Sequence, residues 1–195
     1  RAIRTLGEVD LIAAEDTRHS RKLLEHFAIK TRVISYHDHN ESQVTASLIA
    51  KIEMGSNIAL ISDAGTPLVS DPGYPLVRTA QESSIRVIPI PGVSAVTTAL
   101  SVAGLACDRF SFEGFLPTGR SARRTRLREV EQETRTMVYL EAPHRILGTL
   151  KEMANVFGGE RTVSIARELT KVFEEIKKDT LTELIEQVHS GELAQ

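Results

Sequence analysis

The sequence predicts a two-domain α/β protein, with a parallel sheet in the first domain and a mixed sheet in the second. Short apolar runs alternate with helical stretches along the chain, a pattern typical of strands covered by helices. Loops rich in glycine and proline follow two of these runs. Near the middle, FSFEGFLP alternates as a half-buried strand does, and we place the boundary before it, which gives domains 1–107 and 108–195.

The elements of the first domain follow from its apolar runs. After RAIRTLGEV, which indicates the end of a helix, short apolar runs predict the strands 9–14, 32–36, 58–61 and 85–90. Helical spacing predicts the helices 20–27, 41–54 (capped near Asn40 or Glu41) and 73–81. A last helix of small residues is expected after Ser94, whose side chain can cap it.

The second domain starts with the alternating strand, which Pro117 and Gly119 end. The remaining pattern predicts a helix at 122–132, a strand at 137–141, a helix at 144–156, a strand at 162–167 and a helix at 181–189. The chain starts with Arg1 on the end of a helix and stops at GELAQ, where an α/β domain would return to its sheet. We therefore expect a chain truncated at both ends.

Composition limits the classes of function. With 195 residues, 41% hydrophobic and 26% charged, the chain is expected to be soluble and globular, and no apolar run approaches the about 20 residues of a membrane helix. The single cysteine, Cys107, fits a reducing cytoplasm. A net charge of −2 means that nucleic-acid binding would need a local patch, and 5% aromatics argue against a base-stacking platform.

The loop after residues 58–61, SDAGTPLVSDPG, predicts a small-molecule cleft. Ligands of open α/β sheets bind off the carboxyl ends of the strands, where this loop lies. It holds no GxGxxG or GxxxxGK[ST] motif, and it carries Asp63 and Asp71 without a Lys or Arg, so a neutral or cationic ligand suits it better than a polyphosphate. The alternative is a structural turn with capping aspartates.

A second loop, PGVSA, follows residues 85–90 on the same predicted edge. Ser94 and Ala95 are small, so a flat ligand or another backbone can approach them closely. Close packing of a helix on the sheet would explain the same residues. The presence of the first loop favours the ligand.

An arginine block, GRSARRTRLR, is the one local signal for RNA. Arginine forks match phosphate, and a basic helix can supply sequence-independent affinity. The bland alternative is a solvated helix face balanced by Glu129, Glu131 and Glu133. The separation into an arginine block and then a glutamate block favours RNA. The arginines of this block are Arg120, Arg123, Arg124, Arg126 and Arg128.

Several motifs together resemble the bacterial 16S rRNA ribose-2′-O-methyltransferase I family, a branch of the tetrapyrrole-methylase-like enzymes. They are AEDTRHSRKLLEHF, SYHDHNE, SDAGTPLVSDPGYPLV, PGVSA, FEGFLP, YLEAPHRI and ARELTKVFEE, in the family's order. The resemblance implies a two-domain tetrapyrrole-methylase-like fold with S-adenosylmethionine in the cleft between the domains. It further implies a homodimer acting on a cytidine 2′-hydroxyl in the decoding region of the small subunit.

Cofactor residues are implied at the positions that match the family's motifs. They are Gly65, Thr66, Pro67 and Val69 in the first loop, Ser94 and Ala95 in the second, and Leu140, Ala166 and Arg167 in the second domain. Two departures concern the ends. Family members begin with an apolar strand and a PIGNL-like loop and continue past a GE-apolar strand, whereas this chain stops at Leu193, Ala194 and Gln195.

Charged groups in four motifs are candidates for catalysis and for RNA contact. A ribose hydroxyl is a weak acid, so a base should help, and the candidates are His37 and Glu168. His37 can instead hydrogen-bond a turn, and Glu168 can pair with Arg167 or Lys171. HDH lacks a third metal ligand at a recognised spacing, so we expect no metal. Arg18, His144 and Arg145 join the arginine block as candidate RNA contacts.

Two other classes of function stay open from the sequence. One is a tetrapyrrole or other small-molecule methylase on the same fold, which would not need the arginine block. The other is a binding module or inactive fragment that does not turn over.

Overall fold

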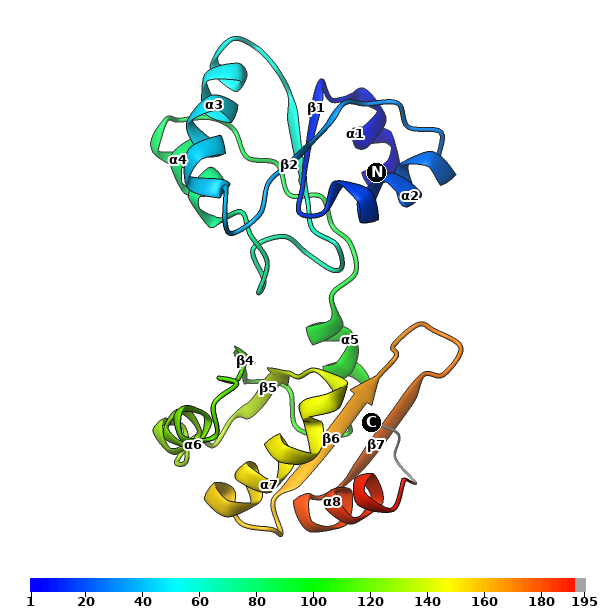
Figure 1. Cartoon of the computed structure of the whole chain (residues 1–195), viewed down its shortest axis with the longest axis vertical. Helices are drawn as coiled ribbons and strands as arrows, with labels where there is room; N and C mark the ends of the chain where they lie inside the picture. Colours follow the sequence, from blue (N-terminus) through cyan, green and yellow to red (C-terminus); the bar gives the residue numbers. More distant parts are fainter. Residues whose placement is uncertain (192–195) are drawn as a thin grey trace. The chain divides into compact units, whose positions relative to one another are not determined.

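The computed structural model describes residues 1–191 and divides into two compact units, Arg1–Ser94 and Ala95–Gln195 (Figure 1). The second unit therefore includes helix α5 (Ala95–Val102), which the boundary predicted after residue 107 would leave in the first. The end of the chain, where a return to the sheet is expected, lies outside the described residues. None of the described helices is long and apolar enough to cross a membrane.

Unit 1 is built on a parallel sheet of three strands in the order β2-β1-β3. The strands are β1 (Leu11–Ala14), β2 (Val33–Ser35) and β3 (Ile58–Ile61). The central strand β1 is buried on both faces, as a parallel strand covered by helices must be. The three strands confirm the predictions at 9–14, 32–36 and 58–61.

Helices cover both faces of this sheet. Leu11 and Ala13 of β1 pack with α3 (Glu41–Glu53) and α4 (Tyr74–Glu82), and the alternate residues Ile12 and Ala14 pack with α1 (Ala2–Glu8) and α2 (Thr17–His26). Helix α2 starts three residues before the predicted Ser20, because the Asp16 side chain caps it by accepting from the backbone N–H groups of Arg18 and His19.

The strand predicted at 85–90 is wrong. No ladder joins this segment to another strand among residues 1–191, and β3 is left as an edge strand. Val87 and Ile88 are 43% and 50% exposed. An apolar run becomes a strand only where a neighbour pairs with its backbone N–H and C=O groups, and sequence pattern alone does not reveal whether that neighbour exists.

Unit 2 holds one parallel and one antiparallel strand pair. Strand β4 (Phe110–Phe115) runs parallel to β5 (Thr136–Leu140), and β6 (Thr162–Arg167) runs antiparallel to β7 (Glu175–Thr180). Both strand directions were predicted for this domain, but β7 was missed because EIKKDT offers a single apolar residue, Ile176. The cross-strand partner in β6 decides its conformation.

The core of unit 2 lies among three helices and the strands. The helices are α6 (Arg120–Glu129), α7 (Ile146–Phe157), which follows the short 3-10 turn η1 (Pro143–Arg145), and α8 (Leu181–Ser190). Leu127, Leu150 and Leu184, one from each helix, are at most 1% exposed. These helices confirm the predictions at 122–132, 144–156 and 181–189 within a few residues.

Replacing Thr180 with alanine is expected to destabilise unit 2 by about 1 kcal/mol, the usual cost of losing a helix cap. The Thr180 hydroxyl accepts from the Glu183 backbone N–H, and the Glu183 carboxylate accepts from the Thr180 N–H, which together form a capping box. Urea denaturation measures the change. Ser190→Ala at the other end of α8 is the control, and an equal loss in both variants would contradict the capping role.

Candidate functional site

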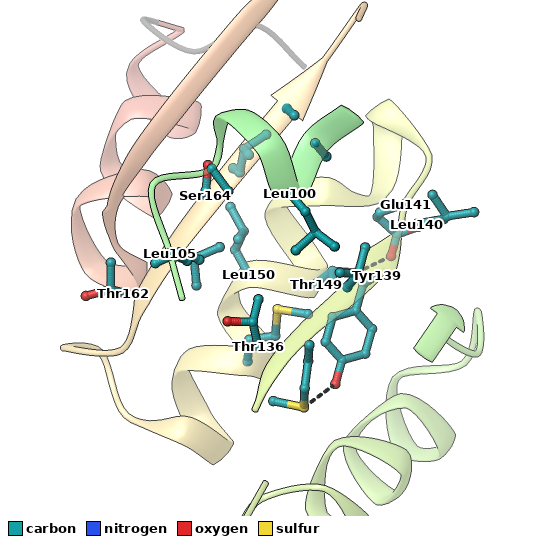
Figure 2. Close-up of a pocket in the computed structure, with 18 of the residues that line it drawn as sticks. Leu100, Leu105, Thr136, Tyr139, Leu140, Glu141, Thr149, Leu150, Thr162 and Ser164 are labelled. Carbon is teal, nitrogen blue, oxygen red and sulfur yellow. Dashed lines mark hydrogen bonds between the residues drawn. The ribbon is translucent and has the colours of Figure 1, made fainter. Parts of the chain in front are cut away.

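Unit 2 contains a cavity of about 950 Å³ between β5 and β6, bounded also by α5 and α7 (Figure 2). Its walls include every residue of 134–141 and of 160–169. Because alternate side chains of a strand point to opposite faces, only a strand edge presents consecutive residues to one space. Within residues 1–191 these edges of β5 and β6 pair with no further strand, so they face the cavity and offer it backbone N–H and C=O groups.

Predicted site residues from three parts of the chain meet at this cavity. Ala95 comes from the start of α5, Leu140 from the end of β5, and Ala166, Arg167 and Glu168 from the end of β6. These segments are far apart in sequence, so the fold alone brings them together. The small and apolar members leave room for a flat ligand, and Arg167 and Glu168 make one part of the wall polar.

A hydrogen-bonded network fixes the polar part of the wall next to Leu140. Glu141 accepts from the Thr149 hydroxyl at 2.5 Å, and its other oxygen lies 3.1 Å from Arg145 Nε. Thr149 in turn accepts from Arg123 Nη1 at 2.8 Å. Glu141 and Thr149 both line the cavity, so this network ties the wall to helix α6. The sequence alone did not identify Thr149, because nothing in the local pattern indicates that it bonds with Glu141 and Arg123.

Two further hydroxyls lie at the wall, as the labelled residues in Figure 2 show. Burial raises the pKa of Tyr139 to about 12, so its phenol stays neutral at working pH and donates to Met137 Sδ at 3.3 Å. Ser164 Oγ is buried and has no hydrogen-bond partner among the described residues. A hydroxyl in that state is a free polar contact for a ligand.

In unit 1, the two predicted ligand loops touch. Thr66 Oγ1 donates to the Val93 carbonyl at 3.2 Å, one residue before Ser94. The first loop is exposed and sharply turned, with Gly65 at φ +74 and Leu68 at φ +73. Gly65, Thr66, Pro67 and Val69 thus belong to one surface loop of unit 1, beside Ser94.

Carboxylates gather at the carboxyl edge of the unit 1 sheet. The Asp63 N–H donates to Glu15 Oε2, and the Asp16 N–H donates to Asp63 Oδ1, both at 3.1 Å. Burial raises the pKa of Glu15 and of Asp71, and repulsion from Asp63 and Asp38 adds to both shifts. Negative charge at this edge disfavours a phosphate, as the loop sequence predicts.

The two candidate bases lie in different units. His37 follows β2; its Nδ1 is buried without a partner within residues 1–191, and its backbone N–H donates to Asn40 Oδ1. Glu168 lies on the cavity wall of unit 2 and accepts from Lys171 Nζ at 2.9 Å. Glu168 therefore makes the ion pair that the bland alternative described, while it also reaches the cavity.

The arginine block is largely paired with carboxylates. Arg120 Nε and Arg124 Nε donate to the two oxygens of Glu152 at 2.6 and 2.8 Å. Arg126 donates to Glu113 and Glu129. Arg123 is only 8% exposed, so its guanidinium lies inside unit 2, away from the surface. The sequence alone could not reveal these ion pairs, because Glu113 and Glu152 lie outside the arginine block.

The other predicted RNA contacts differ in their exposure and in their hydrogen-bond partners. Arg18 is exposed and pairs with Asp16 at 3.1 Å. His144 is exposed in η1. Arg145 is mostly buried and donates to the Leu116 and Pro117 carbonyls, so it supports the chain around the cavity. No cluster of three or more potential metal ligands occurs among the residues that the structure describes.

Replacing Glu152 with glutamine is expected to cost about 2 kcal/mol at neutral pH, since hydrogen bonds to charged groups are among the stronger ones. Arg124 and Arg120 hold the pKa of Glu152 below its usual range. A lowered folded-state pKa contributes stability above the unfolded-state value, and this contribution is lost as pH falls through the folded-state value. The difference between wild type and variant should therefore shrink in acid.

Urea denaturation of both proteins at neutral and at acid pH measures this effect. Glu131→Gln, a change at an exposed carboxylate of the same region, is the matched control. A cost for Glu152→Gln that persists undiminished in acid would contradict the ion-pair origin.

Comparisons with known proteins give a consistent result. A model of the tetrapyrrole (corrin/porphyrin) methylases matches residues 1–185. Ribosomal RNA small subunit methyltransferase I of Pseudomonas aeruginosa is 54% identical over 190 residues, covering 97% of this chain and 67% of that protein. The Haemophilus influenzae protein of the same name is 53% identical over 186 residues, covering 95% and 66%. The chain thus spans about two thirds of the length of these relatives.

Solved structures show the same fold at lower identity. The cobalt precorrin-4 methyltransferase CbiF has a TM-score of 0.65 at 15% identity, covering 99% of this chain and 83% of that chain. Uroporphyrin-III C-methyltransferase from Thermus thermophilus, solved with S-adenosyl homocysteine, has a TM-score of 0.61 at 18% identity, covering 100% and 84%.

Proposed function

Because the chain belongs to the tetrapyrrole (corrin/porphyrin) methylase family and within it to the ribosomal RNA small subunit methyltransferase I group, we propose that it methylates the 2′-hydroxyl of a cytidine in 16S rRNA. The observation that carries this proposal is the identity above 50% along almost the whole chain to proteins of that name. The methyl donor is S-adenosylmethionine, the donor that this family uses.

The cavity of unit 2 fits part of this donor. Its volume lies at the upper end of the range of about 300–1,000 Å³ typical of small-molecule sites. Ala95, Leu140 and Ala166 supply flat apolar walls, and the buried Ser164 hydroxyl supplies a polar contact. When bound, the cofactor supplies a methyl group on a positively charged sulfur. The protein's part is to hold that group in line with the attacking oxygen and to exclude water.

A proton must leave the ribose hydroxyl during transfer. Glu168 is the better placed of the two candidate bases, because it lies on the cavity wall with Ala166 and Arg167. Its carboxylate lies 2.9 Å from Lys171 Nζ. His37 is the second candidate, because its Nδ1 has no hydrogen-bond partner among the described residues. Either group would accept the proton that leaves the 2′-oxygen.

Three finer parts of the proposal rest on the family resemblance. They are a homodimeric state, a cytoplasmic location, and 16S rRNA within the small ribosomal subunit as the partner. A single exposed cysteine, Cys107, is compatible with a reducing compartment.

Methyl transfer to ribosomal subunits tests the function. The protein is incubated with radiolabelled S-adenosylmethionine and, in parallel, with unmodified small subunits or uroporphyrinogen III; the rRNA is digested and analysed by mass spectrometry. We expect label in 2′-O-methylcytidine. Label on uroporphyrinogen III with none on rRNA would replace the proposal with a small-molecule methylase, and no label on either would overturn it.

A further inference from the structure

We propose that the exposed face of helix α2, and not the arginine-rich helix α6, is the surface that contacts the phosphate backbone of the substrate RNA. The inference rests on the proposed function and assigns the part of the molecule that holds the RNA. It follows from the ion pairing and exposure of the basic side chains on the two helices.

On α6, most of the arginines already form ion pairs with carboxylates of unit 2. Arg120 and Arg124 share Glu152, whose side chain is 3% exposed, and Arg126 bridges two further glutamates. A phosphate would have to compete with these charge-assisted bonds, and stripping Glu152 of its partners would leave a buried charge unpaired. Helix α6 is therefore mainly a structural element of unit 2.

On α2, the basic side chains are exposed and mostly unpaired. Arg21 and Lys22 make no ion pair with any residue in the described part of the chain, and both are exposed. At 100° per residue they lie on either side of Arg18, which is one turn before them. Arg18 and Lys22 lie opposite the buried Ser20 and Leu24, and Arg21 lies at the edge of this face, next to Leu24.

Two carboxylates adjoin this face. Asp16 pairs with Arg18, and Glu25 lies one turn after Arg21 and Lys22, while Lys30 adds a further positive charge just after the helix. Two histidines of α2, His19 and His26, are exposed as well. We name the set Arg18, Arg21 and Lys22 the α2 basic face.

The position of α2 connects this face with the ligand loops of unit 1. The helix begins directly after β1, and the Asp16 N–H at its cap donates to Asp63, in the loop that follows β3 (Figure 1). The acidic edge repels phosphate, while the basic face one turn away attracts it. An RNA strand would thus place its phosphates along α2 and present an uncharged ribose to the loop edge.

Salt-dependent binding separates the two helices. Each phosphate contact releases counterions, so removing one lowers the slope of log affinity against log salt by about 1. The double variant Arg21→Gln/Lys22→Gln is compared with Arg120→Gln/Arg124→Gln on α6. Lys51→Gln/Arg86→Gln, which removes two exposed charges elsewhere in unit 1, is the matched control. Binding to small ribosomal subunits is measured by filter retention over a series of potassium chloride concentrations.

We expect the α2 variant to lose about tenfold in RNA affinity at low salt, with a slope smaller by about 2 and an unchanged affinity for S-adenosylmethionine. The matched control should bind as wild type does. Loss confined to the α6 variant, or an equal loss in the α2 variant and the matched control, would overturn the inference. If the α2 variant binds RNA normally and the wild-type protein methylates rRNA, this inference is overturned and the proposed function stands. Wild-type protein that binds no subunits would overturn both.

Discussion

Replacing Ala166 with phenylalanine is expected to lower the affinity for S-adenosylmethionine by about 100-fold, a loss of about 2.7 kcal/mol. Ala166 lies on the cavity wall with Leu140 and Arg167. A phenyl ring there takes the space that the ligand needs, and a packed interior gives way only at a cost. Isothermal titration calorimetry with wild type and variant measures the difference.

The control for this prediction is Ala122→Phe, the same enlargement at an exposed position of α6 away from the cavity. It should bind the cofactor as wild type does. Urea denaturation of Ala166→Phe shows whether the protein still folds, which the open space at this position allows. A folded Ala166→Phe variant with unchanged affinity would mean that the cofactor does not use this cavity.

Replacing Gly73 with alanine is expected to destabilise unit 1 by about 2–3 kcal/mol, because strained backbone costs about 1–3 kcal/mol and crowding adds to it. Gly73 has φ +135, a region that residues with a side chain rarely adopt. A Cβ would lie 2.6 Å from Leu60 Cδ2 and 2.8 Å from Leu68 Cδ1. The two leucine side chains can shift, but the backbone strain would persist.

Gly7→Ala is the matched control for Gly73→Ala. Gly7 lies within α1, and no atom stands within 4 Å of its Cβ position. The substitution should stabilise the protein by about 0.5–1 kcal/mol through the higher helix propensity of alanine. Urea denaturation of both variants compares them. If Gly73→Ala were as stable as wild type, the tight turn before α4 would not depend on glycine.

The strands of unit 1 that the sequence predicted correctly are those with a neighbour in the sheet. Residues 58–61 and 85–90 are similar apolar runs, but β3 pairs with β1 while 85–90 pairs with no strand within residues 1–191. The two runs have a similar hydrophobic pattern, and ladder formation depends on a second segment. For the same reason β7, which has little apolar character, was missed and exists because β6 pairs with it.

The site was only partly predictable. The family resemblance, confirmed by the family model and the relatives, supplied Ala95, Leu140 and Ala166, and the structure brings these three to one cavity. Their role as cofactor contacts stays a prediction. For the arginine block, the sequence showed the charges but not their partners. Glu152 belongs to another helix, and its burial beside Arg120 and Arg124 follows from the tertiary packing.

The central claim is that the cavity of unit 2 holds part of S-adenosylmethionine. The most direct measurement is ultraviolet cross-linking of methyl-labelled S-adenosylmethionine to the protein, followed by mass spectrometry of the peptides, with unlabelled S-adenosyl homocysteine as competitor. We predict competed label in peptides from the walls of the cavity, residues 95–106, 134–141 and 160–169. Competed label confined to other peptides, or no competed label at all, would contradict the claim.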